Sequence, residues 1–313
     1  MSKEGGAETG MSRDGIPLSL NRPPAEDLEP WISRMMVAVV TLDNQQVTHG
    51  LLCNDASYVR TAIGADWSVQ TADGTIALRD ETFVSGQHSK AMPLRFAGGI
   101  KVAGFMLRPG AIRSIWNVDD GTLIDRIKPA AYIGFDDAAL TRIYDPEMTP
   151  AEWLVEMEHW LRGTIERRCC DVPDAISQRF EVAAFADPNQ SIAEFADANT
   201  VTPRTLQRII KRDFGLTPKQ IMRRARTLDL AARICGVADE AEEEDMYLRF
   251  FDQSHQIREF VAFFGMTPQQ FLTSRQALLT LSLEIRQARR LELLHRIDPG
   301  AIRPWMRDPF QAA

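Results

Sequence analysis

The chain has 313 residues, 44% of them hydrophobic and 25% charged, with a net charge of −7. This composition is typical of a globular protein, and the length leaves room for two domains with separate cores. No apolar run approaches the roughly 18 residues of a membrane-spanning helix, and the four cysteines are not spaced as a disulfide or metal framework.

Residues 1–26 form a polar, glycine-rich segment without the hydrophobic stretch of a signal peptide. We predict that this segment is a disordered tail. Together with the few cysteines, the lack of a signal segment favours a reduced, cytoplasmic protein with no membrane contact.

Residues 27–145 are predicted to form a β-rich domain. Short runs of Val, Ile, Thr and aromatic residues alternate with turn signals, which favours a small barrel or sandwich. The predicted strands are Met36–Leu42, Val47–Leu52, Tyr58–Ile63, Trp67–Thr71, Thr75–Leu78, Leu94–Phe96 and Lys101–Leu107. The stretch GGIKVAGFMLRPGAIRSIW resembles the strand–turn–helix end of cupin-like sensory domains, which implies a small-molecule effector of unknown identity.

This domain offers few metal ligands. A cupin-type metal site needs about three histidines and a carboxylate, whereas the region contains only His49 and His88. We therefore predict no cofactor, no metal and no catalytic residue; a cupin-fold enzyme acting on a small molecule is the alternative. Residues that could line a pocket, or equally be ordinary core or surface residues, are Trp67, Phe83, Arg95 and Trp116.

Residues 146–172 are predicted to contain a linker helix. Thr149, Pro150 and Glu152 provide an N-cap, a first helical residue and a capping-box partner. An apolar stripe at helical spacing follows, made of Trp153, Leu154, Met157, Trp160, Leu161 and Ile165. The stripe packs either on the β-rich domain or on a second subunit, and we favour the second arrangement, a homodimer.

Residues 173–272 carry the signals of a helix-turn-helix unit. Ser191 and Glu194 fit a capping box before a short helix over residues 192–198, and Thr202 begins a second helix after a three-residue turn. The second helix ends at Gly215, since glycine suits the left-handed position there. Opposite its apolar positions lie Arg204, Gln207, Arg208 and Lys211.

That polar face is either a plain solvated surface or a surface that reads DNA, because Arg and Gln make bidentate contacts with guanine and adenine. Charge placement favours DNA. Residues 201–233 contain nine Lys or Arg and only two Asp in an otherwise acidic chain. A local basic region of this kind is suited to neutralising phosphates.

The turn after the second helix is repeated fifty residues later. Phe214-Gly215-Leu216-Thr217-Pro218 is matched by Phe264-Gly265-Met266-Thr267-Pro268. In both copies Thr caps the following helix and Pro occupies its first position. A duplicated helix end and helix start predicts a duplicated structural unit.

From residue 191 to residue 271 the sequence resembles the DNA-binding domain of the AraC/XylS family of bacterial transcription regulators. The motifs that carry the resemblance are SIAEFADANTVTPRTLQRIIKRDFGLTPKQI and RFFDQSHQIREFVAFFGMTPQQF. It implies about seven helices, with two helix-turn-helix units joined by a central helix over residues 218–234. The two recognition helices would enter successive major grooves of double-stranded promoter DNA, and an activator would also contact RNA polymerase.

The resemblance further implies DNA-contacting residues in both units. Those of the first unit are Thr202, Arg204, Thr205, Gln207, Arg208, Lys211 and Arg212. Those of the second unit are Gln253, Ser254, His255, Ile257 and Arg258. Base reading is expected of Arg204, Gln207 and Arg208, and phosphate contact of Lys211, Arg212, Arg223 and Arg224.

The second unit departs from the first in charge. It has Val261 and Ala262 at the places of Lys211 and Arg212, and the helix predicted before it carries the acidic run Glu240–Asp245. The first unit should therefore supply most of the affinity for DNA, and the second should mainly adjust specificity. An adaptor protein that keeps the fold without strong DNA binding is a further alternative.

Residues 273–313 are predicted to form a helical extension past the usual end of the family domain. It covers a core edge, extends the DNA footprint or contacts a partner, and we favour packing. The predicted fold is thus multidomain α+β, with a small cupin-like β-barrel domain followed by an all-α domain with two helix-turn-helix units.

Overall fold

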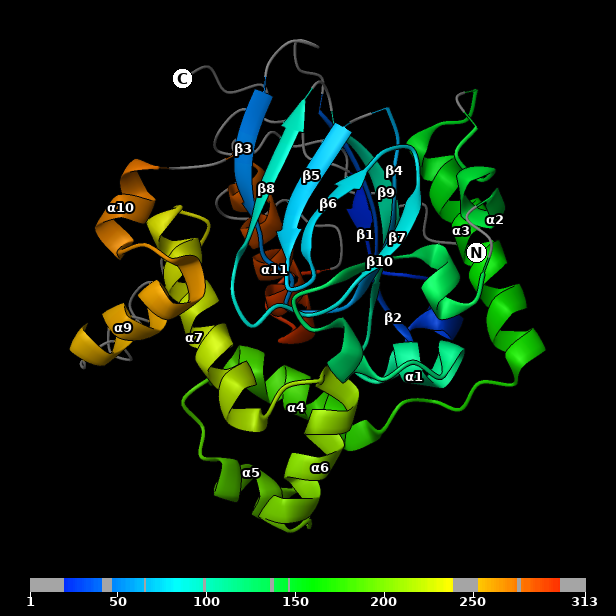
Figure 1. Ribbon diagram of the computed structural model, residues 1–313. Helices are drawn as coiled ribbons and strands as arrows, with labels where there is room; N and C mark the ends of the chain where they lie inside the picture. Colours follow the sequence, from blue (N-terminus) through cyan, green and yellow to red (C-terminus); the bar gives the residue numbers. More distant parts are fainter. Residues whose placement is uncertain are drawn as a thin grey trace.

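The computed structural model describes residues 20–40, 47–64, 66–97, 100–135, 138–145, 147–238, 253–274 and 277–298. A β-rich N-terminal half is followed by a helical C-terminal half (Figure 1), which confirms the predicted fold class. Most of the predicted tail, up to residue 19, and the acidic run Glu240–Asp245 lie outside the described residues. None of the helices in the described ranges has the length and apolarity of a membrane span.

Two antiparallel sheets make up the β-rich half. The larger sheet has the order β1 (Asn21–Arg22), β2 (Ile32–Val40), β9 (Ile100–Leu107), β4 (Tyr58–Ala62), β7 (Thr82–Ser85) and β10 (Ile127–Pro129). The smaller sheet has the order β3 (Val47–Leu52), β8 (Met92–Ala97), β5 (Asp66–Thr71) and β6 (Gly74–Leu78). All seven predicted strands overlap observed ones. β1, β7 and β10 have no counterpart in the prediction, because two to four residues are too few to show a period.

Side chains fill the space between the two sheets. Along β8 the residues alternate, so that Met92, Leu94 and Phe96 are buried and the residues between them are exposed. Their neighbours in this core include Trp67 of β5 and Phe83 of β7, whose ring centroids lie 6.5 Å apart. The interior of the β-rich domain is therefore a packed core around these aromatic rings.

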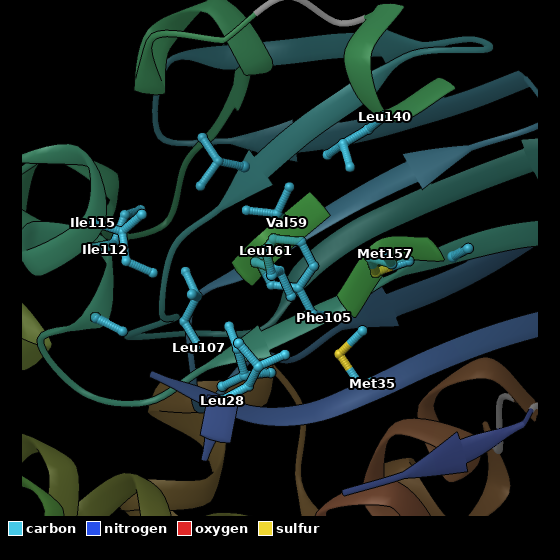
Figure 2. Packing of buried hydrophobic residues seen from close by; sticks show 14 of the residues in the cluster. Leu28, Met35, Val59, Phe105, Leu107, Ile112, Ile115, Leu140, Met157 and Leu161 are labelled. Atoms are coloured by element: carbon cyan, nitrogen blue, oxygen red, sulfur yellow. The ribbon is translucent and has the colours of Figure 1, made fainter. Parts of the chain in front are cut away.

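The outer face of the larger sheet is covered by the 3₁₀ helix η1 (Glu26–Leu28), by α1 (Ala111–Trp116), by α2 (Ala138–Thr141) and by α3 (Pro150–Arg168). Figure 2 shows this core, with Met35, Val59 and Phe105 of the sheet beside Met157 and Leu161 of α3. The start of α3 is as predicted, since Thr149 and Glu152 form a complete capping box.

The apolar stripe of α3 faces this sheet. Trp153, Leu154, Met157 and Leu161 are at most 2% exposed, and they belong to the same core cluster as Phe105. The preference for a dimer built on this stripe is therefore wrong, because folding of the chain itself already buries these side chains.

The helical half is arranged around α7 (Pro218–Ile234), with helices packed near each of its ends (Figure 1). The first unit contains α4 (Ala175–Ala186), α5 (Ile192–Ala198) and α6 (Pro203–Phe214). The described part of the second unit contains α9 (Gln253–Phe264) and α10 (Pro268–Thr273), and the helix predicted before α9 lies outside the described residues. Each unit has its own core. The first gathers Phe180, Leu206, Phe214 and Ile221, and the second gathers Leu228, Phe260, Phe264 and Phe271.

The last helix of the described residues, α11 (Ala277–Leu293), lies between the two halves. Leu281 and Ile285 pack with Met36, Tyr58 and Met106 of the larger sheet. Other residues of α11, namely Leu279, Leu283 and Leu291, belong to the core of the second unit. The part of the predicted extension that forms α11 thus packs inside the molecule and joins the β-rich half to the helical half, whereas residues 299–313 lie outside the described ranges.

Candidate nucleic-acid interface

The first unit is built as its sequence predicts. The Oγ of Ser191 accepts the backbone N–H of Glu194 at the start of α5, and the Oγ1 of Thr202 accepts that of Thr205 at 3.1 Å at the start of α6. These bonds satisfy amide groups that have no partner within their own helix. The path of the chain into α6 is therefore fixed at its first turn.

The two faces of α6 have opposite character. Leu206, Ile209, Ile210 and Phe214 are buried, and the Phe214 ring meets that of Phe180 edge-on with centroids 6.1 Å apart. The face turned to solvent carries four exposed side chains, Arg204, Gln207, Arg208 and Lys211. Of the other predicted contacts, Thr202 is exposed and Thr205 is half-buried. Most of the predicted first-unit site therefore lies together on one accessible surface.

Arg212 differs from these residues because carboxylates surround its guanidinium group. It donates to Asp213 from both Nε (2.6 Å) and Nη2 (2.7 Å), and its Nη2 also donates to Asp174 (3.0 Å). The hydrogen bonds to Asp213 raise the pKa of Arg212 above its ordinary value. A phosphate at this residue would have to compete with two carboxylates.

Arg224 lies inside the molecule. Its guanidinium donates to the carbonyl oxygens of His88 (3.2 Å) and Asp55 (2.9 Å) and to Oε1 of Gln87 (2.8 Å), all in the β-rich half. Burial lowers the pKa of Arg224 to about 10. Its predicted role in holding phosphate is therefore wrong in this arrangement, whereas Arg223 on the same helix is exposed.

The second unit repeats the turn of the first. Gly215 and Gly265 have φ angles of 67° and 73°, the left-handed region that glycine adopts without strain. Thr217 with Gln220 and Thr267 with Gln270 form complete capping boxes, each with a proline at the start of its helix. The repeated turn and helix start predicted from the sequence are confirmed down to these hydrogen bonds.

The exposed surface of α9 is much less basic than that of α6. His255, Ile257 and Arg258 are exposed, and so are Val261 and Ala262 at the places matching Lys211 and Arg212. Ile257 retains 44% and Val261 37% of its accessible surface. The side chains of the predicted contacts Gln253 and Ser254 lie outside the described residues.

The end of α6 touches the β-rich half directly. The N–H of Gly110, which precedes α1, donates to the carbonyl of Asp213 at 3.0 Å. Gly215 packs so closely on the 3₁₀ helix η2 (Asp120–Leu123) that an added Cβ would lie 2.8 Å from the carbonyl oxygen of Asp120. The contact was not predicted, because sequence spacing does not reveal which loops meet across a domain boundary.

The residues predicted to line a pocket do not converge. Trp67 and Phe83 lie in the core between the sheets, Trp116 lies under α3, and Arg95 is exposed on β8. A small recess does occur between the two halves. Its lining combines charged residues, which include Asp55, Glu181, Arg224, Arg286 and Arg289, with apolar residues such as Phe185 and Leu228, and it has space for about one water molecule.

The two histidines of the β-rich half have different surroundings. His49 is exposed on β3. His88 is fully buried, where its Nδ1 lies 3.1 Å from the carbonyl of Leu52 and 3.2 Å from the backbone nitrogen of Asn54. Burial lowers the pKa of His88 to about 4, so this imidazole is neutral at pH 7. Across the described ranges, no three His, Cys, Asp or Glu residues are grouped as metal ligands.

Two family models match parts of the chain. Residues 195–274 match a helix-turn-helix domain, and residues 21–129 match a domain of unknown function (DUF6597). The match to the helix-turn-helix domain, together with the geometry of α5, α6, α9 and α10, defines a DNA-binding transcription regulator of the helix-turn-helix class. Its C-terminal domain is of the AraC type, as the sequence motifs predict.

Similar solved structures include ToxT from Vibrio cholerae O395, with 9% identity, 76% of this chain and 97% of that chain covered, and a TM-score of 0.44. For ToxT from Vibrio cholerae strain SCE256 bound to an unsaturated fatty acid, the sequence identity is 9% and the TM-score is 0.43, with 76% of this chain and 94% of that chain covered. For the AraC-like transcriptional activator CuxR, the sequence identity is 10% and the TM-score is 0.28, with 66% of this chain and 84% of that chain covered. Similarity at this level gives no guide to a ligand. The comparison with curated proteins found no match.

Proposed function

We propose that this protein binds promoter DNA in a sequence-specific manner, with α6 in one major groove and α9 in the next. The observation that carries the proposal is the exposed face of α6. Its Arg204, Gln207, Arg208 and Lys211 project from a helix whose opposite side is fixed in a core. A helix presented in this way fits the major groove, where Arg and Gln distinguish guanine and adenine.

The two units are proposed to contribute unequally. The face of α6 offers three cationic side chains to phosphates and bases, whereas α9 places Ile257, Val261 and Ala262 around Arg258. Aliphatic side chains in the major groove contact thymine methyl groups but attract no phosphate. The first unit would then supply most of the salt-dependent affinity, and the second would adjust specificity.

We propose that the β-rich domain, residues 27–145, senses a small molecule and controls the DNA-binding domain, residues 173–272. In this proposal residues 146–172 are the linker between the two domains, and residues 273–313 are an extension that follows the DNA-binding domain. The contacts between the halves at Gly110, Gly215 and Arg224 support the control of the DNA-binding domain by the β-rich domain. A conformational change in the β-rich domain would be transmitted to the end of α6 through the contacts at Gly110 and Gly215.

Substituting Arg208→Ala tests the proposed reading of bases. Loss of a bidentate contact should weaken binding to a site selected from random DNA by about 1–3 kcal/mol, with little change on unrelated DNA. Binding of the full chain would be followed by fluorescence anisotropy, with circular dichroism to check folding.

Lys211→Ala serves as the matched control on the same helix. It should weaken binding to all sequences alike and reduce the dependence of affinity on salt by about one phosphate contact. Unchanged affinity of Arg208→Ala for the selected site would contradict the assignment. If the wild-type chain shows no salt-dependent DNA binding at all, the adaptor alternative replaces the proposal.

A further inference from the structure

Arg226 on α7 holds residues of both helix-turn-helix units at once. Its Nη1 donates to the carbonyl of Pro188, in the turn between α4 and α5, at 2.8 Å. Its Nη2 donates to Oε1 of Glu259 on α9 at 3.1 Å, and its Nε approaches Oε2 of the same residue at 3.3 Å. One side chain therefore joins the first unit, the central helix and the second unit.

The chemistry of this side chain gives the junction a definite geometry. The guanidinium group is planar and its five N–H donors point in fixed directions, so a carboxylate bound by two of them is held in orientation as well as in distance. The Arg226 and Glu259 side chains are only 21% and 10% exposed, which limits screening by salt.

The apolar contacts of α9 hold it less specifically. Phe260 and Phe264 bury α9 against Leu228 and Ala231 of α7, and such contacts are non-directional. They keep the helix on its neighbour but tolerate rotation or sliding. The ion pair adds the direction that these contacts lack.

We propose that Arg226 is a positioning residue that sets the relative placement of α6 and α9, and thereby the spacing of the two half-sites that the protein accepts on DNA. This inference rests on the proposed function, in which both units contact DNA. In this proposal Arg226 does not contact DNA: it donates to the Pro188 carbonyl and to Glu259, whose carboxylate balances its charge.

The test measures spacing preference with the full chain. A site selected from random DNA is compared with the same site carrying about five additional base pairs, half a helical turn, between its two half-motifs. The wild-type protein should discriminate strongly between the two, since both units engage together only when the geometry allows. Arg226→Met should reduce this discrimination by about tenfold and leave the base preference at the α6 half-motif unchanged.

Further variants separate the two arms of the junction. Glu259→Gln keeps a hydrogen-bond acceptor on α9 but loses the ion pair, so discrimination should fall less than in Arg226→Met. Arg226→Lys should not restore the wild-type value, because one ammonium group cannot reproduce the fork. Arg223→Met is the matched control: it removes one exposed charge from α7 and should weaken binding at both spacings equally.

The outcomes are distinguishable. If Arg226→Met and Glu259→Gln both fold and keep the wild-type spacing preference, the inference is wrong and the proposed function stands. If the wild-type protein selects only a single half-site, the proposed role of the second unit fails, and the inference fails with it. If Arg226→Met does not fold, Glu259→Gln decides the question in the same assay.

Discussion

Asp120 is an acidic residue buried at the contact between the β-rich half and α6. Its Oδ1 accepts a hydrogen bond from the Oγ of Ser57 at 3.1 Å, and its Oδ2 is buried without a partner. Burial raises the pKa of Asp120 well above its ordinary value. The hydrogen bond from Ser57 lowers the pKa, the nearby Asp213 and Asp119 raise it, and Arg113 lowers it. The surroundings therefore favour the protonated carboxyl group.

Substituting Asp120→Asn should stabilise the protein at neutral pH. The folded chain retains a proton on Asp120 that the unfolded chain loses near pH 3.8. The contribution of Asp120 to the free energy of unfolding is thus fully present below that pH and is lost as pH rises through the raised pKa. Asn keeps an acceptor for Ser57 and cannot ionise. Its advantage should grow with pH by at most about 1.4 kcal/mol per unit.

This effect is measured by thermal unfolding of the wild type and of Asp120→Asn. The pH range runs from about 3.5, near the ordinary carboxyl pKa, to about 8, just above neutrality. Asp187→Asn is the control, since its side chain is exposed and Asn can still accept the backbone N–H of Asn189. A stability difference between wild type and Asp120→Asn that does not vary with pH would show that folding does not raise the pKa of Asp120.

At the scale of elements, the two repeated turns share a conformation and differ in surroundings. Gly215 and Gly265 both have left-handed φ angles. A Cβ on Gly215 would lie 2.8 Å from backbone atoms of Asp120 and Gly121, whereas a Cβ on Gly265 would meet nothing within 4 Å. The same turn is thus a free surface feature in one unit and part of a domain contact in the other.

Alanine substitutions at the two glycines should therefore have unequal effects. Gly265→Ala incurs only the strain of a left-handed residue, about 1–2 kcal/mol. Gly215→Ala incurs the same strain and in addition forces η2 away from α6, so it should lower the free energy of unfolding distinctly more. Urea denaturation measures both values, and equal losses would mean that the contact with η2 contributes nothing to stability.

Local signals in the sequence predicted the helices of the repeat well. The caps at Thr202, Thr217 and Thr267 depend on residues three positions apart, so their spacing is visible in the chain. The sequence did not decide whether α3 packs on the β-rich domain or on a second subunit, because an apolar stripe does not identify the surface that covers it. Arg224 was assigned to phosphate from local charge density, and its acceptors in the β-rich half are more than 130 positions away.

At the scale of the whole molecule, buried charges on α11 connect the two halves. Arg286 lies 2.6 Å from Oδ1 of Asp229 on α7 and 3.2 Å from Oδ2 of Asp55 in the β-rich half. Glu292 pairs with Arg34 of β2, and Arg289 pairs with Glu181 of α4. Since each pair loses water on burial, these contacts favour one arrangement of the halves more than they add net stability.

Substituting Arg286→Met should cost about 3–5 kcal/mol, because it leaves two buried carboxylates without their cation. Arg79→Met is the control: Arg79 pairs with Asp66 at the surface with 72% of its side chain exposed, so its loss should cost less than about 1 kcal/mol. Calorimetry should show one transition for the wild type and a lower, broadened or split transition for Arg286→Met. Two separate transitions in the wild type would contradict this coupling.

The place of α11 also sets the order in which the molecule can be completed during synthesis. The surface formed by Met36, Tyr58 and Met106 is covered by Leu281 and Ile285, which a ribosome adds more than 170 residues after Met106. Until then the newly made β-rich half exposes an apolar surface, which favours aggregation or chaperone binding. The two halves are consecutive in sequence, yet the first becomes complete only when α11 has been made.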